Sequence, residues 1–110
     1  MGSLTEVTDA TFAAEVLASD VPVIVEFGAP WCRPCKAIEP ALTEIAADAG
    51  EHVRLVRLDI DANLRTPSLY GVLSIPTVIL FADGEPRETL IGPHGKGRYA
   101  RAFAPYLPQG

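Results

Sequence analysis

The sequence predicts an α/β fold, in which a central β-sheet carries helices on both faces. The length of 110 residues fits a single domain, so residues 1–110 are expected to fold as one unit. Hydrophobic residues make up 48% of the chain and charged residues 21%, a composition typical of soluble globular proteins. Apolar segments of strand length alternate with helical segments in the order β α β α β α β β α, which is the arrangement of α/β sheets.

The N-terminal segment predicts a strand followed by a helix. Residues 3–7 are a candidate for a short strand. Thr8 or Asp9 is suited to cap a helix that extends to about residue 19, because the side-chain oxygen of either residue accepts a hydrogen bond from a free backbone N–H in the first turn.

The next strand and helix surround the two cysteines of the chain. Residues 23–27 are apolar except at Glu26, which is typical of a strand covered on both faces. A helix is expected to begin around residues 32–34, because Pro34 suits a first turn in which its missing N–H would have no partner. The helix is expected to stop before Gly50, a typical C-terminal residue.

The second half of the chain predicts three strands and two helical segments. In chain order these are a strand at 53–58, a helical connection at 59–70, strands at 77–81 and 87–91, and an amphipathic helix at 97–107. Asp83-Gly84 joins the last two strands, and this pair is typical of a tight β-hairpin turn.

Charge and hydropathy exclude two classes of partner. The formal net charge is −5 and the basic residues form no block, which argues against nucleic-acid binding. The longest nearly apolar stretch, residues 21–27, is far shorter than the ~20 residues that span a bilayer. Residues 1–12 have neither the basic nor the apolar region of a secretory signal, so we expect a cytoplasmic protein without a membrane partner.

Cys32 and Cys35 are the only cysteines. In a reducing compartment a structural disulfide is not expected, and closing a ring of about four residues would contribute only ~2 kcal/mol. Structural zinc usually takes four ligands, and the other candidates, His52 and His94, lack the spacing of a zinc-binding pair. No metal site is therefore predicted. Two inert core cysteines remain an alternative, which the position beside Trp31 at a helix start disfavours.

The position of Cys32 at a helix start indicates redox chemistry. Free backbone N–H groups and the helix dipole favour a thiolate there. Lowering a thiol pKa from ~8.5 to ~7 raises the thiolate fraction at pH 7 about 16-fold, but the loss of nucleophilicity leaves a net gain of about threefold. Holding Cys35 within reach therefore supplies most of the advantage. Cys32 is expected to be the more exposed sulfur, so we predict that it attacks a disulfide and that Cys35 resolves the mixed disulfide.

The string Trp31-Cys32-Arg33-Pro34-Cys35-Lys36, followed by Ile75-Pro76-Thr77 and Gly92, resembles the thioredoxin family over essentially the whole chain. The resemblance implies a thioredoxin fold, a central mixed β-sheet of about five strands flanked by four α-helices. It implies a monomeric protein-disulfide oxidoreductase that carries out reversible dithiol–disulfide exchange with protein substrates. It also implies no bound cofactor, and recharging by thioredoxin reductase with electrons from NADPH. The nucleophile of the family corresponds to Cys32 and its resolving thiol to Cys35.

A substrate-docking surface is predicted around the cysteines. Its expected members are Trp31, Pro34, Ile75, Pro76, Gly92 and Pro93. In the family, the proline that corresponds to Pro76 is cis, and the backbone beside it pairs with substrate as an added strand. An ordinary turn proline before a strand is the alternative.

Glu26 stands where thioredoxins usually carry Asp, a buried proton acceptor for the resolving cysteine. Strand alternation places Glu26 on the face of Ile24 and opposite Phe27. A buried carboxylate costs free energy unless it is paired. The resemblance implies that Glu26 accepts the proton of Cys35, and a half-exposed Glu26 without a catalytic part is the alternative.

Three further residues depart from the family pattern. Arg57 replaces the usual Lys and is expected beside Glu26, where its charge would keep Glu26 ionised; a solvated arginine at a strand end is the alternative. Arg33 replaces a Gly between the cysteines, and its charge is expected to favour the Cys32 thiolate, with altered target preference as the alternative. Gly28 replaces a Trp, which is expected to thin the packing beside the motif.

Two other functions remain open from the sequence. The same motif serves disulfide oxidants and isomerases, and a reduction potential of about −270 mV rather than about −120 mV would separate a reductase from an oxidant. The other possibility is a non-catalytic scaffold that binds a partner around Trp31. A Cys32→Ser, Cys35→Ser double variant that still complements would reveal such a scaffold.

Overall fold

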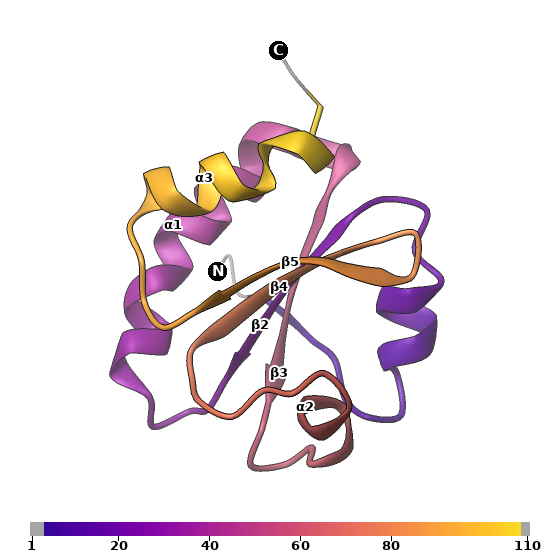
Figure 1. The fold of residues 1–110 in the computed structure, drawn as a ribbon, viewed down its shortest axis with the longest axis vertical. Coiled ribbons are helices and arrows are strands. Elements are labelled where there is room, and N and C mark those ends of the chain that lie inside the picture. Colours follow the sequence, from indigo (N-terminus) through magenta and orange to yellow (C-terminus); the bar gives the residue numbers. More distant parts are fainter. Residues whose placement is uncertain (1–3, 109–110) are drawn as a thin grey trace.

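A five-stranded β-sheet forms the centre of the molecule (Figure 1). The structure is a computed structural model and describes residues 4–108. The strands are β1 (Thr5–Glu6), β2 (Val23–Gly28), β3 (Arg54–Asp59), β4 (Thr77–Ala82) and β5 (Glu85–Ile91), in the spatial order β1-β3-β2-β4-β5. β2 pairs with β3 in parallel and with β4 in antiparallel orientation. The predicted mixed sheet of about five strands is therefore confirmed.

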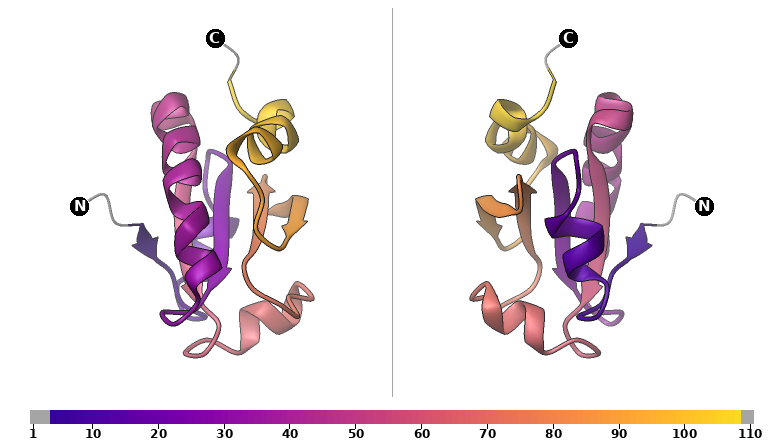
Figure 2. Two further views of the ribbon diagram at one scale, coloured as in Figure 1. Left: turned by 90° about the vertical axis from the view of Figure 1, so that its left-hand side faces the viewer. Right: turned by 90° about the vertical axis from the view of Figure 1, so that its right-hand side faces the viewer.

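Helices cover both faces of this sheet (Figure 2). α1 (Arg33–Ala49) and α3 (Lys96–Phe103) lie on one face, and the helical segment η1 (Ala13–Leu17) lies on the opposite face. α2 (Arg65–Leu69) lies at the end of the sheet where β4 begins. Short 3₁₀ turns, η2 (Gly50–His52) and η3 (Ala104–Tyr106), follow α1 and α3. Within residues 4–108, no helix has both the length and the apolar character to cross a membrane.

Strand β2 divides two apolar cores because it lies at the centre of the sheet and is buried along its whole length. Val23, Val25 and Phe27 belong to the core on the face of η1. Ile24 belongs to the core that α1 and α3 cover. By the alternation of strand side chains, Glu26 points to the same face as Ile24, as predicted.

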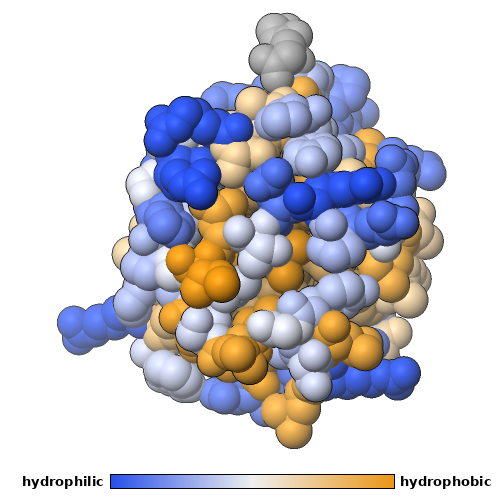
Figure 3. All heavy atoms as spheres, viewed as in Figure 1, coloured by the Kyte–Doolittle hydropathy of each residue, from blue (hydrophilic) through white to orange (hydrophobic). Residues whose placement is uncertain are grey.

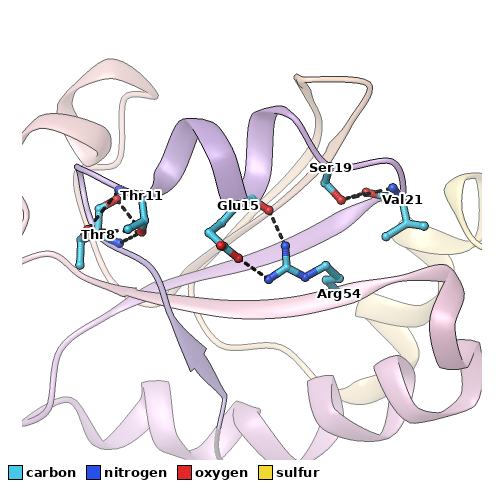
Figure 4. A network of polar contacts seen from close by, with 6 residues as sticks. All are labelled: Thr8, Thr11, Glu15, Ser19, Val21 and Arg54. Atoms are coloured by element: carbon cyan, nitrogen blue, oxygen red, sulfur yellow. Dashed lines mark hydrogen bonds and ion pairs between the residues drawn. The ribbon is translucent and has the colours of Figure 1, made fainter.

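The first helix is shorter than the predicted span of residues 8–19. The helical segment η1 spans Ala13–Leu17 only. Thr8 begins the turn before it, as expected of a capping residue: its hydroxyl accepts a hydrogen bond from the Thr11 N–H, and its own N–H donates to the Thr11 hydroxyl (Figure 4). Arg54 of β3 holds η1 against the sheet. Its guanidinium donates to the main-chain oxygen of Glu15 at 2.6 Å and to the Glu15 carboxylate at 2.7 Å.

Asp9 caps a different helix from the one predicted. Its carboxylate accepts hydrogen bonds from the backbone N–H groups of Arg65 at 3.0 Å and Thr66 at 2.8 Å, at the start of α2. The hydroxyl of Thr66 donates to the same carboxylate at 2.7 Å. A short helix gains from an anion at its N-terminus, and these hydrogen bonds hold the pKa of Asp9 below its usual value.

The β4–β5 hairpin follows the prediction, with small shifts in the bounds of the neighbouring elements. Asp83 and Gly84 have φ angles of 55° and 78°, and the left-handed conformation at both positions is what a type I′ hairpin turn requires. β5 begins at Glu85, so it includes Pro86, which an edge strand tolerates because no partner needs its N–H. The last helix, α3, ends at Phe103 rather than at residue 107.

Candidate active site

The N-terminus of α1 positions both cysteines. Cys32 is the N-cap residue, with extended backbone, and the helix begins at Arg33 with Pro34 in its first turn. The Sγ atom of Cys32 accepts a hydrogen bond from the backbone N–H of Cys35 at 3.2 Å. The predicted helix start is therefore confirmed, and the Cys32 sulfur lies at the positive end of the helix dipole.

Cys32 and Cys35 form a disulfide bond, with their Cα atoms 5.3 Å apart. Their exposed fractions are 3% and 2%, so both residues are buried in this oxidised form, and a greater exposure of the Cys32 sulfur stays a prediction. Ala29 and Ile75 pack against the pair and cover it. The two sulfurs differ in their surroundings instead, because Cys32 caps α1 whereas Cys35 lines a pocket beside β2.

The loop before β4 packs on the cysteines, and the loop after β5 is joined to it by a hydrogen bond. The Ile75–Pro76 peptide bond is cis, as the resemblance implies. Ile75 packs on the disulfide, whereas Pro76 is buried. The N–H of Gly92 donates to the main-chain oxygen of Pro76 at 2.8 Å, which joins the loop after β5 to the loop before β4.

Trp31 is the most prominent exposed side chain beside the disulfide, with 67% of its surface open to solvent. Its indole Nε1–H donates to the Oδ2 atom of Asp61 at 2.7 Å. Asp61 follows β3 and was not predicted from the sequence as a residue of the site. Its position in the sequence could have indicated this. Asp61 follows the end of β3, β3 pairs in parallel with β2, and β2 leads directly to Trp31.

Apolar residues gather over the end of the molecule where β2 leads into α1 and where α2 lies (Figure 3). The large exposed hydrophobic side chains of the described residues are Trp31, Leu64, Leu69, Leu73 and Ile91. Of the other residues predicted for docking, Pro34 and Pro93 are exposed, and Ile75 and Gly92 are partly exposed. The leucines around α2 were not predicted, because an exposed apolar residue cannot be told from a buried one by its type.

Glu26 is fully buried, so the half-exposed alternative is excluded. Neither of its carboxylate oxygens has a hydrogen-bond donor among the described residues. Burial, and after it the neighbouring carboxylate of Glu39, raise the pKa of Glu26 to about 9. The charge of Arg57 lowers the pKa but is the smallest of these effects. At neutral pH, Glu26 therefore carries its proton.

Arg57 lies opposite Glu26 in the β2–β3 register but pairs with other carboxylates. Its Nη1 donates to Oε2 of Glu39 at 3.0 Å, and its Nη2 donates to Oε2 of Glu6 at 3.0 Å. Arg57 lowers the pKa of Glu26 in the expected direction, but burial and Glu39 outweigh it, so Glu26 is not kept ionised at neutral pH. The guanidinium pairs with two carboxylates that are closer to solvent and offsets only a small part of the cost of burying a charge on Glu26.

A pocket of about 140 Å³ reaches from the surface to Cys35 and Glu26. It is lined by residues of β1, β2, β3 and α1 and of the loop between β2 and α1: Glu6, Glu26, Gly28, Ala29, Pro30, Cys35, Lys36, Glu39, Arg57 and Asp59. Exposed Glu6 and buried Glu26 are both members of this lining, so the pocket connects the interior carboxyl with the solvent side of the sheet.

Gly28 forms the wall of the pocket closest to the resolving sulfur. A Cβ atom at this position would lie 3.1 Å from Sγ of Cys35 and 3.6 Å from Oε2 of Glu26. The backbone of β2 therefore approaches Cys35 closely because residue 28 has no side chain. The same point lies between the Cys35 sulfur and the Glu26 carboxyl, so these two groups face one small space.

Arg33 is exposed in the first turn of α1 and has no ion-pair partner among the described residues. Its effect on the Cys32 thiolate stays a prediction. Within residues 4–108, no three His, Cys, Asp or Glu side chains lie close enough together to hold a metal ion.

Comparison with known proteins agrees with this geometry. The thioredoxin family model matches residues 3–103. The thioredoxin of Mycobacterium tuberculosis strain H37Rv is 44% identical over 103 residues, which cover 94% of this chain and 89% of that protein. The thioredoxin of Rickettsia typhi is 51% identical over 86 residues, which cover 78% of this chain and 82% of that protein.

A third relative joins two activities in one polypeptide. The bifunctional thioredoxin reductase/thioredoxin of Mycobacterium leprae is 42% identical over 107 residues, which cover 97% of this chain and 23% of that protein. The family match and these identities extend over most of the chain and include the region of the cysteine pair. The chain therefore belongs to the thioredoxin family, as a disulfide oxidoreductase that acts through Cys32 and Cys35.

Proposed function

We propose that this chain reduces disulfide bonds in other proteins, with Cys32 as the attacking thiolate and Cys35 as the resolving thiol. The observation that carries the proposal is the placement of the Cys32 sulfur at the N-cap of α1, beside exposed Trp31 and in contact with Ile75. A sulfur at this cap is stabilised as a thiolate by the helix dipole and by the N–H of Cys35.

The reaction transfers two electrons from the dithiol to the target. The Cys32 thiolate attacks one sulfur of the target disulfide, so a mixed disulfide forms and the other target sulfur leaves as a thiolate. Cys35 then loses its proton and attacks the Cys32 sulfur. The Cys32–Cys35 bond forms, the bond to the target breaks, and the second target sulfur leaves. The pair ends in the disulfide-bonded state that the structure shows.

Glu26 is proposed as the group that receives the Cys35 proton. Its carboxyl and the Cys35 sulfur face the same space beside Gly28. A pKa of about 9 for Glu26 lies close to the ordinary value of ~8.5 for a thiol. Such a match makes proton transfer between the two groups nearly neutral in free energy.

The docking surface is proposed to be the apolar rim of the disulfide. Trp31, Pro34 and Pro93 offer exposed apolar contacts, and the chain beside Pro76 is proposed to pair with an extended segment of the target. Trp31 is held by its hydrogen bond to Asp61, so its ring is ordered before a target binds.

A thioredoxin reductase is the proposed source of electrons, which it takes from NADPH. The Mycobacterium leprae relative supports this partner because its name assigns both activities to one chain. The cytoplasmic location and the monomeric state stay predictions.

NADPH consumption with a thioredoxin reductase and a disulfide-containing protein substrate tests this function. Absorbance at the NADPH band should fall only when this chain is present, and the Cys32→Ser variant should be inactive. If the rate with the wild-type chain equals the rate without it, while a known thioredoxin is active in the same assay, the proposed function is wrong.

A further inference from the structure

Glu39 lines the same pocket as Glu26 but is partly exposed to solvent. Its side chain on α1 is 21% exposed, whereas Glu26 is fully buried. Both line the pocket that also contains Cys35. Cys35 and Glu26 are therefore the interior groups of the pocket, and Glu39 is a carboxylate of the same pocket that reaches solvent.

Arg57 holds the carboxylate of Glu39 in place. Its Nη1 atom binds Oε2 of Glu39 at 3.0 Å, which leaves Oε1 of Glu39 without an ion-pair partner. Among the described residues, neither oxygen of Glu26 has a hydrogen-bond partner. The carboxylate of Glu39 is nevertheless near enough to raise the pKa of Glu26, and a carboxylic acid beside a carboxylate can pass its proton to it.

Glu26 alone has the wrong charge for a base at neutral pH. With a pKa of about 9, only about one Glu26 in a hundred is ionised at pH 7. A neutral carboxyl still moves protons, because it accepts one on one oxygen while it releases another from the second oxygen. The release needs a carboxylate beside Glu26, and Glu39 is a carboxylate of the same pocket that is near enough to raise the pKa of Glu26.

We propose that Glu39 is the terminal proton acceptor for Cys35, reached through the neutral carboxyl of Glu26 and held in place by Arg57. In the resolving step the Cys35 thiol gives its proton to one oxygen of Glu26, and the other oxygen of Glu26 gives its proton to Glu39. The Cys35 thiolate then attacks the Cys32 sulfur, and Glu39 releases the proton to water at the pocket mouth. This inference rests on the proposed function, because it assigns the proton path of the same exchange.

Other charged or titratable groups of the pocket come from every element around it. They are Glu6 on β1, Arg57 and Asp59 on β3, and Lys36 and Cys35 on α1. From α3, Tyr99 is near enough that the charge of Glu26 raises its pKa. Among the described residues, neither Asp59 nor Lys36 shifts the pKa of Glu26, and Glu6 pairs with Arg57. Glu39 is thus the carboxylate of this group that acts on Glu26 directly.

The test separates the two thiol steps. The reduced chain is mixed with an aromatic disulfide whose thiolate is coloured when released. The first release reports the attack of Cys32, and the second release reports resolution by Cys35. Both rates are measured from pH 6 to pH 10 in the wild type and in Glu39→Gln. Glu44→Gln is the matched control, because Glu44 loses the same charge on the same helix but pairs with Lys96, away from the pocket.

Glu39→Gln is expected to slow the second release about tenfold or more at pH 7. Its rate should rise with pH toward that of the wild type, because ionised Glu26 must then act alone. The first release and both releases of Glu44→Gln should match the wild type.

If Glu39 acted only through its charge and passed on no proton, Glu39→Gln would change the rate of the second release in the opposite direction. Loss of its negative charge would lower the pKa of Glu26, so the second release would accelerate at pH 7. That result, or an unchanged second release, would overturn the proposal. Absence of the first release in the wild type would instead count against the proposed function itself. Circular dichroism of Glu39→Gln checks that a slow second release does not come from unfolding.

Discussion

Arg57 and Glu26 are direct neighbours in the β2–β3 register, yet the guanidinium of Arg57 binds Glu39 and Glu6 and leaves Glu26 without a donor. An arginine beside a buried carboxyl is usually taken to keep it ionised. Here the two carboxylates closer to solvent take the hydrogen bonds, and Glu26 is held in its neutral form. The charge state of buried Glu26 therefore depends on its burial and on Glu39 and Arg57, which lie far from it in the sequence.

Glu26→Gln is predicted to stabilise the protein at neutral pH. The pKa of Glu26 is raised from 4.5 to about 9 on folding, so the folded state holds more protons than the unfolded state between these values. The free energy of unfolding of the wild type then falls as pH rises through this window. At pH 7 the variant should exceed the wild type by on the order of 3 kcal/mol.

Urea unfolding of both proteins between pH 5 and pH 9 checks this prediction. The difference should be small near pH 5 and should increase toward pH 9. Two parallel curves over this range would show that Glu26 is not neutral in the folded state. Glu44→Gln provides the control, since that side chain is exposed.

Gly28→Ala is predicted to destabilise the protein and to slow resolution. The new Cβ would lie 3.1 Å from the Cys35 sulfur, so the sulfur or the strand has to move. Overpacking of this kind costs about 1–3 kcal/mol. Thermal unfolding of the oxidised form and the rate of the resolving step are the measurements.

Gly97→Ala is the matched control for Gly28. Its Cβ would meet only the end of the flexible Arg101 side chain, at 3.2 Å, within α3. Alanine in a helix is favoured over glycine by about 0.5–1 kcal/mol, so this variant should gain stability. If both substitutions change stability with the same sign, the close approach of β2 to Cys35 is not the cause.

Asp61→Ala is predicted to weaken the binding of protein substrates. It removes the acceptor of the Trp31 indole, so the exposed ring loses its fixed orientation. We expect KM for a protein disulfide to rise about two- to fivefold, as for the loss of about one hydrogen bond, with kcat nearly unchanged.

Trp31 is the only tryptophan of the chain, so its fluorescence reports the loss of the hydrogen bond directly. Asp61→Asn keeps an acceptor oxygen and should behave more like the wild type. A kcat that falls while KM stays constant would show that Asp61 acts on the chemistry rather than on docking.

Arg33→Gly is predicted to raise the pKa of the Cys32 thiol and to make the disulfide less oxidising. Arg33 is exposed beside Cys32, and a positive charge there favours the thiolate of the reduced form. Thiolate absorbance against pH and redox equilibrium with glutathione measure the two effects. Arg33→Lys keeps the charge and should resemble the wild type, and equal shifts in both variants would exclude a charge effect.

The order of strands and helices could be predicted because each element has a local cause. The apolar run of β2, the proline at the start of α1 and the Asp83-Gly84 turn are all visible over a few residues. The cysteine pair could be predicted for the same reason, since its helix cap and spacing lie within one turn. The extent of the first helix could not, because Asp9 has a better partner in α2, more than fifty residues away.

The proton path of the site lies beyond the reach of sequence patterns. Glu39 has the appearance of an ordinary surface residue of α1, and only the fold brings it beside Glu26 and Arg57. The burial of the cysteine pair also depends on a distant part of the chain, because Ile75 packs against it from the loop before β4. In both cases the outcome depends on which segments the sheet brings together.

The division of roles between the two sulfurs is tested most directly by trapping the mixed disulfide. Cys35→Ser and Cys32→Ser are each reduced, mixed with a disulfide-containing protein and examined by mass spectrometry after proteolysis. Cys35→Ser is expected to accumulate a target linked through Cys32, whereas Cys32→Ser accumulates none. A target linked through Cys35 in Cys32→Ser, together with no adduct on Cys32 in Cys35→Ser, would show that the roles of the two sulfurs are reversed.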